Sequence, residues 1–108
     1  MKKLVAGMKL YCVAYFHFSK GTERRLQSTT IKRINPTTVT TEWYDAHRIK
    51  LTDIGKEVFL SKKEAYARAL KKHQIVYEQE KNNRNFNKKV FENEIVYLKR
   101  KIREEDRR

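Results

Sequence analysis

The sequence predicts an α+β protein in which a small antiparallel, partly closed β-sheet of four or five strands, SH3-like in form, precedes one or two C-terminal helices. Two observations predict this class. Segments rich in aromatic and β-branched residues recur between turn signals over the first 60 residues. The pattern Ser61-Lys62-Lys63-Glu64 then has the form of a helix capping box and opens a stretch with helical periodicity. We therefore expect a β-rich domain over residues 1–77, with its packed helix from about residue 62, and a charged helical tail over residues 78–108.

Five segments have the composition of strands, and turn-forming residues separate them. They are residues 8–18, 24–34, 37–44, 48–51 and 58–60. The first carries apolar side chains on both faces, which predicts a central strand. In the second, Leu26 and Ile34 fall on one face and Ile31 on the other, which indicates a β-bulge.

Alternation along the third and fourth segments separates inward from outward side chains. Val39, Thr41 and Trp43 share one face of the third segment. In the fourth, we expect an inward set and an outward set. The inward residues are His47, Ile49 and Leu51, and the outward residues are Arg48 and Lys50.

Two helical patterns follow Ser61, and they are out of phase with each other. The first places an apolar stripe along one face, formed by Ala65, Tyr66, Ala69, Leu70, His73, Val76 and Tyr77. The pattern fails from Glu78 to Asn87, a stretch that holds four asparagines. A second apolar series then recurs at spacings of 4, 3 and 4, and we call it the seam: Phe91, Ile95, Leu98 and Ile102. Either the helix breaks near residues 82–87, or one long helix meets different surfaces along its length.

The chain is strongly basic, with a formal net charge of +13 from 26 Lys and Arg against 13 Asp and Glu. Residues 1–60 hold 11 basic and five acidic groups, and residues 61–108 hold 15 and eight, so the charge is not confined to one end. Such a field attracts polyanions. The alternative is that the charge serves solubility and reflects a Lys-, Asn- and Glu-rich composition, with no polyanionic partner.

Two groups of cations are candidates for binding nucleic acid. On the sheet they are Arg24, Arg25, Lys32, Arg33, Arg48 and Lys50. On the tail they are Lys88, Lys89, Lys99, Arg100, Lys101 and Arg103. Tyr11, Tyr15 and Tyr44 accompany the first group, and exposed rings of this kind stack on bases while cations follow the phosphates. Tyr11 and Tyr15 belong instead to the core if a helix covers them.

Motifs for catalysis, cofactors or metals are missing from the sequence. It contains no Walker loop, dinucleotide fingerprint or nucleophile elbow, and Cys12 with three histidines lacks the spacing of a metal site. We therefore expect neither an enzyme nor a cofactor. A single cysteine cannot form an internal disulfide, and no apolar run approaches the length of a membrane span, so we expect a cytoplasmic protein without a membrane partner.

Residues 55–65, GKEVFLSKKEA, resemble a pattern found in small uncharacterised proteins of bacteriophages and mobile elements. In those proteins an SH3-like or barrel-like sheet ends in G-x-x-V-F-L-[ST] and enters a helix at x-x-E-A. The resemblance covers about 15 residues at the end of the sheet and the start of the helix. It implies a fold and a phage or plasmid setting, and it assigns no activity and no functional residue.

Two functions are consistent with these patterns. The first is a phage- or plasmid-encoded accessory protein that binds nucleic acid largely independently of sequence, which the charge favours. The second is a protein-interaction module or an inhibitor of a host protein, which uses the C-terminal helix. In that hypothesis the seam is the contact surface, either for the host protein or for a second copy of the chain in a homodimer.

Overall fold

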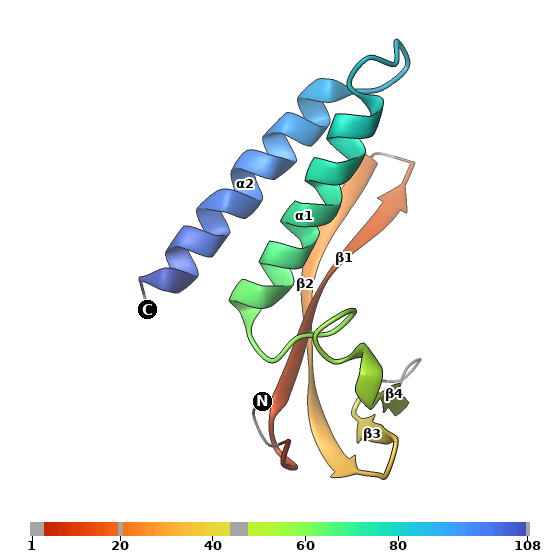
Figure 1. The fold of residues 1–108 in the computed structure, drawn as a ribbon, viewed down its shortest axis with the longest axis vertical. Coiled ribbons are helices and arrows are strands. Elements are labelled where there is room, and N and C mark those ends of the chain that lie inside the picture. The colour runs from red at the N-terminus through yellow and green to blue at the C-terminus, as the bar shows by residue number, and fades with distance from the viewer. Residues whose placement is uncertain (1–3, 20, 44–47, 108) are drawn as a thin grey trace. The chain divides into compact units, whose positions relative to one another are not determined.

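The computed structural model describes residues 4–19, 21–43 and 48–107. Its elements in chain order are β1 (Lys9–Phe18), β2 (Gly21–Ile34), β3 (Thr38–Thr41), β4 (Arg48–Lys50), the 3-10 helix η1 (Leu51–Asp53), α1 (Lys62–Glu80) and α2 (Lys88–Asp106) (Figure 1). The chain divides into two compact units, Met1–Ala65 and Tyr66–Arg108. The first holds the sheet and the second holds most of the two helices.

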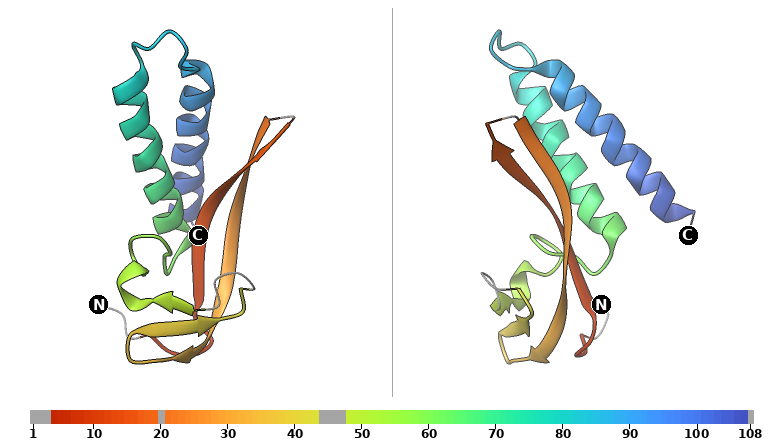
Figure 2. Two further views of the ribbon diagram at one scale, coloured as in Figure 1. Left: turned by 90° about the vertical axis from the view of Figure 1, so that its right-hand side faces the viewer. Right: turned by 180° about the vertical axis from the view of Figure 1, so that it is seen from behind.

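The sheet is antiparallel throughout and has the order β1-β2-β3-β4. The hairpin of β1 and β2 is long, and its register runs from Lys9 opposite Thr30 to Phe18 opposite Gly21. The two short strands β3 and β4 continue the sheet beside the end of β2, where the sheet curls into a half-barrel (Figure 2). The predicted class, a partly closed antiparallel sheet followed by C-terminal helices, is confirmed.

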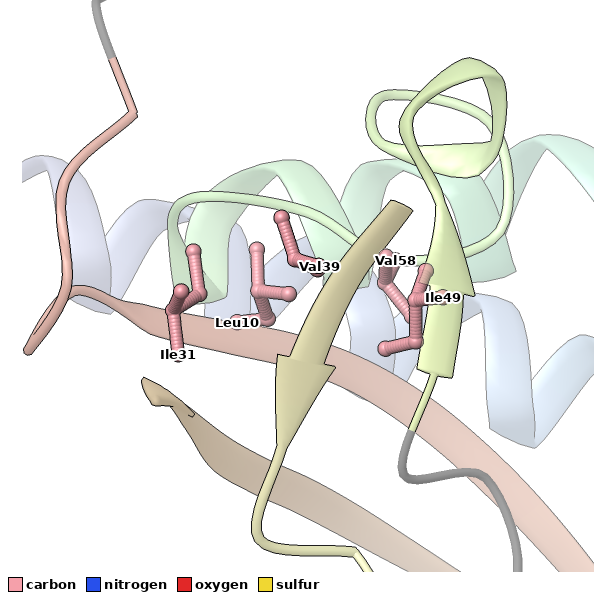
Figure 3. Close-up of a cluster of buried hydrophobic side chains, with 5 residues drawn as sticks. All are labelled: Leu10, Ile31, Val39, Ile49 and Val58. Carbon is pink, nitrogen blue, oxygen red and sulfur yellow. The ribbon is translucent and has the colours of Figure 1, made fainter. Parts of the chain in front are cut away.

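The core of the sheet unit is a cluster to which every strand contributes one side chain. Leu10, Ile31, Val39 and Ile49 come from β1 to β4, and Val58 comes from the segment after η1 (Figure 3). Trp43 and Leu51 are partly buried and pack against this cluster. The shared face predicted for Val39, Thr41 and Trp43 is therefore confirmed, and it is the inward one. The inward positions predicted for Ile49 and Leu51 are also confirmed. His47 lies outside the described residues.

Two expectations about the strands are wrong. Residues 58–60 form no fifth strand, because Gly55, with φ of +94°, turns the chain back so that its N–H donates to the Val58 carbonyl at 2.7 Å. Only Phe59 then pairs with β1, through two hydrogen bonds with Tyr11 of 2.7 and 2.8 Å between N and O. As a result β1 is an edge strand of the sheet and not a central one.

The predicted bulge lies in β2. Ile31 is opposite Thr41 and Arg33 is opposite Thr40, so Lys32 is the extra residue. The third strand ends at Thr41, three residues earlier than predicted, where the Glu42 N–H donates to the Thr29 hydroxyl at 3.2 Å.

The helices form as two separate elements, so the break is the correct alternative. The Ser61 hydroxyl accepts from the Glu64 N–H at 3.2 Å, as the capping pattern predicts for the start of α1. The Asn87 side chain caps α2 by accepting from the Val90 N–H at 3.3 Å. All three views show α1 and α2 side by side and antiparallel (Figure 1; Figure 2).

Aromatic contacts join the helices near their connection. The Phe91 ring lies 5.2 Å from His73 and 4.7 Å from Phe86, measured between ring centroids. The Tyr77 hydroxyl donates to a Glu92 carboxylate oxygen at 2.9 Å, and this hydrogen bond raises the pKa of Tyr77. Part of the seam therefore packs against α1 within one chain.

Candidate functional site

The face of the sheet that points away from its core carries four exposed cations, which we call the sheet patch: Lys32, Arg33, Arg48 and Lys50. On β4, Arg48 and Lys50 flank the buried Ile49 and so point outward, as predicted. On β2, Arg33 is opposite Thr40, which is itself opposite Arg48 on β4. Since neighbouring strands lie about 4.8 Å apart, the backbones of Arg33 and Arg48 are about 10 Å apart across β3.

The bulge explains why two consecutive cations are exposed on β2. In a regular strand, neighbouring side chains point to opposite faces, so one of Lys32 and Arg33 would face the core. The extra residue relieves this alternation: Ile31 is 1% exposed, whereas Lys32 and Arg33 are both exposed. The irregularity therefore adds one positive charge to the outer surface.

Asn35 fixes the orientation of Arg33. Its side-chain oxygen accepts from the Arg33 Nε at 3.1 Å, and its side-chain nitrogen donates to the hydroxyls of Thr38 and Thr40 at 3.0 and 3.1 Å. The Nε contact leaves the two terminal nitrogens of the guanidinium as donors. Asn35 is one of the turn-forming residues between the second and third predicted strand segments, and a role at the site was not predicted for it.

The cations of the sheet patch are not neutralised by carboxylates among the residues that the structure describes. Within residues 4–19, 21–43 and 48–107, none of its four cations forms an ion pair. Glu42 is exposed directly after the end of β3, and it forms no ion pair with the four cations. The patch can therefore attract an anion without first breaking a salt bridge within the described chain.

The other two sheet cations lie elsewhere, along the β1–β2 hairpin. Arg25 is paired with Glu23 in a two-pronged contact of 3.1 and 2.9 Å, and its guanidinium lies 4.9 Å from the centre of the Phe16 ring. The hydrogen bond from Arg25 holds the pKa of Glu23 below its usual range. Arg24 is half-buried and lies opposite Tyr15. The structure thus groups four of the six predicted sheet cations and separates the other two from them.

Two of the three aromatic rings predicted to stack on bases, Tyr11 and Tyr15, are not on the sheet patch. Tyr11 and Tyr15 are half-buried on β1, and Tyr11 is held by its backbone pairing with Phe59. Tyr44 lies outside the described residues. The sheet patch therefore lacks two of the three rings that were predicted to accompany its cations.

On α2, the predicted cations differ in their surroundings. Lys101 forms an ion pair with Glu104 at 3.1 Å and lies 5.9 Å from the centre of the Tyr66 ring, and the hydrogen bond to Glu104 raises the pKa of Lys101. Arg100 lies over the Tyr97 ring at 5.3 Å. The remaining predicted cations of this helix are exposed: Lys88, Lys89, Lys99 and Arg103.

The seam is the predicted partner interface, and it is partly buried in the single chain. Leu98 is 0% exposed, and Phe91, Ile95 and Ile102 are half-buried. A homodimer or a host-protein complex through these residues stays a prediction. Light scattering on the wild-type chain and on Ile102→Glu, a half-buried position of the seam, tests the dimer, since a dimer that depends on the seam should become a monomer in the variant.

Other chemistry has little support in the described part of the chain. It contains no group of three or more His, Cys, Asp or Glu residues that could hold a metal ion. The Cys12 thiol is half-buried, which raises its pKa. None of the described helices combines the length and the apolar character that a bilayer crossing requires.

Comparisons with known protein families, curated proteins and solved structures find no match.

Proposed function

We propose that this protein binds nucleic acid through the phosphate backbone, with the sheet patch as the contact surface. The observation that supports the proposal best is the row Arg33–Thr40–Arg48, extended by Lys32 and Lys50, on one exposed face. Arginine presents donors in a planar fork that matches the oxygens of a phosphate. Four cations grouped in this way favour a polyanion over a single small anion.

Binding of this kind is largely independent of base sequence. Phosphate contacts fix a protein on a nucleic acid but carry no sequence information, which is read from base edges. The sheet patch supplies phosphate donors, and none of its four cations contacts an aromatic ring of the described residues. The protein then acts as an accessory factor that coats or positions nucleic acid.

Salt dependence tests the proposal. Binding of double- and single-stranded oligonucleotides of mixed sequence is measured over a salt titration, and affinity should fall steeply because bound cations release counterions from the nucleic acid. The variant Lys32→Gln/Arg48→Gln removes two charges of the sheet patch. It should lower the slope of log affinity against log salt by about two, one for each lost phosphate contact.

A control with the same net charge separates a specific surface from bulk charge. Arg25→Gln/Lys81→Gln removes two cations that already pair with carboxylates, Arg25 with Glu23 and Lys81 with Glu78. Its slope should stay close to that of the wild type. Equal effects of the two double variants would contradict the sheet patch as the site, and absence of binding at low salt would contradict nucleic-acid binding altogether.

A further inference from the structure

The face of α2 opposite the seam is an exposed row of six residues that includes four cations, and we call it the α2 stripe. Its residues recur at spacings of 4, 3, 4, 3 and 4: Lys89, Asn93, Val96, Arg100, Arg103 and Arg107. All six are exposed. The stripe holds four cations, one amide and one valine, and no carboxylate.

The stripe is the outward face of the helical hairpin. Each of its first five residues lies two positions before a residue of an inward series. That series consists of the buried Leu98 and the half-buried Phe91, Ile95, Ile102 and Glu105. Two residues correspond to about 200° around an α-helix, so the stripe lies almost opposite that series. Packing of the seam in the helical unit therefore turns the four cations toward solvent.

Ion pairing divides the cations of α2 into two kinds. Lys101, on the side of the helix, is matched to Glu104 at 3.1 Å. The four stripe cations form no ion pair within the described chain, and Arg100 contacts only the Tyr97 ring. The helix thus neutralises a cation away from the stripe and leaves the cations along it available.

Helix stability does not account for this distribution. Arg103 and Arg107 lie near the C-terminus of α2, where a cation is favourable toward the helix dipole. Lys89 lies in the first turn, which contains no acidic residue, and there a cation opposes the dipole. A series that keeps its positive charge even where the helix disfavours it indicates a ligand that runs along the whole helix.

We propose that the α2 stripe is a second phosphate-backbone surface, independent of the sheet patch. The inference rests on the proposed function for the chemistry of its ligand. From Lys89 to Arg107 the stripe extends about 27 Å at 1.5 Å per residue. One strand of a duplex carries about eight phosphates over that distance, at 3.4 Å each. Four cations in line on such a helix match an extended polyanion.

The test uses the full chain and the same oligonucleotides. Arg100→Gln/Arg103→Gln removes two stripe charges while keeping residues of similar helix propensity, and it should lower the salt slope by about two. The matched control Lys81→Gln/Lys101→Gln has the same net charge and removes two ion-paired cations, so its slope should stay unchanged. Arg100→Lys/Arg103→Lys keeps the charges and should retain most of the slope. Circular dichroism of each variant confirms that the helices are intact.

Combining the stripe variant with Lys32→Gln/Arg48→Gln separates the two proposals. Independent surfaces predict that the quadruple variant lowers the slope by about four. A stripe variant with the wild-type slope, beside a sheet-patch variant with a reduced slope, overturns this inference and leaves the proposed function standing. A reduced slope for the stripe variant alone supports the inference and overturns the sheet patch as a site.

Discussion

Among single residues, Asn35 serves both the turn after β2 and the sheet patch. Its backbone N–H donates to the Thr38 carbonyl at 2.8 Å, which closes the connection to β3. Its side chain at the same time joins Arg33 to the hydroxyls of Thr38 and Thr40. Because Pro36 follows with a fixed φ, the turn is stiff, and Arg33 is anchored to a rigid part of the chain.

Replacing Asn35 with alanine should reduce stability and weaken binding together. The variant loses three side-chain hydrogen bonds that are partly shielded from water, and we expect a cost of about 1–2 kcal/mol in the free energy of unfolding. Denaturant unfolding measures this cost. Asn82→Ala is the control, because Asn82 is exposed between α1 and α2 and belongs to neither proposed binding surface. An Asn35→Ala midpoint equal to that of Asn82→Ala would contradict the role of the side chain.

Replacing Ser61 with alanine removes the cap of α1. The Glu64 N–H then loses its 3.2 Å partner, and we expect the protein to be destabilised by about 1 kcal/mol. Chemical denaturation checks the loss against Ser28→Ala, a change at an exposed position of β2 that should have little effect. If both variants unfold at the wild-type midpoint, Ser61 does not stabilise the helix.

Some residue partners could have been predicted from spacing, and others could not. Glu23 lies two residues before Arg25 on the same face of a strand, and Glu104 lies three residues after Lys101 on a helix. Both separations favour ion pairs, so the sequence could have predicted that Arg25 and Lys101 are paired with carboxylates. The link between Arg33 and Asn35 depends on how the turn after Ile34 places the amide, which composition does not define.

At the scale of elements, periodicity predicted most of the sheet and both helices. The position of Ile31 on the opposite face from Leu26 and Ile34 predicted the bulge in β2. The asparagines after Glu80 predicted the break between the helices. The edge position of β1 did not follow. Apolar residues on both faces of β1 indicate that both faces can be covered by other parts of the protein. They do not indicate how many strands pair with β1, because paired strands lie in the plane of the sheet.

The packing of α2 can be tested at Leu98. Leu98→Ala should cost about 2–5 kcal/mol in the free energy of unfolding, because the side chain is 0% exposed and its removal leaves a cavity. Val96→Ala, two residues away on the same helix, removes a side chain that is 64% exposed and should change stability by less than about 0.5 kcal/mol. Thermal or denaturant unfolding of the two variants measures the difference, and equal costs would contradict the assignment of inward and outward faces.

For the whole molecule, the positive charge is shared between the two units. Residues 1–65 hold 13 Lys and Arg against six Asp and Glu, and residues 66–108 hold 13 against seven. Each unit therefore has its own basic surface, the sheet patch on the first and the α2 stripe on the second. This division is the reason that the two proposals can be tested separately.

A chain that ends at Gln79 should retain a cooperative fold. All five side chains of the core cluster come from residues before 66, so the truncation leaves that core complete, whereas Tyr66 loses its contact with Lys101. We expect a single thermal transition at a lower midpoint than that of the full chain. A broad, non-cooperative melt would show that α2 is required for the sheet unit to fold.

The position of Trp43 gives the protein a built-in optical reporter. It is the only tryptophan, and it packs against the core of the sheet unit, so its fluorescence follows that unit. Far-ultraviolet circular dichroism is dominated by helix, and α1 and α2 lie almost entirely in the second unit. Two signals recorded during one unfolding experiment therefore follow different halves of the chain without any label. Coincident curves would show that the halves unfold as one cooperative system, and separated curves would give the order in which they are lost.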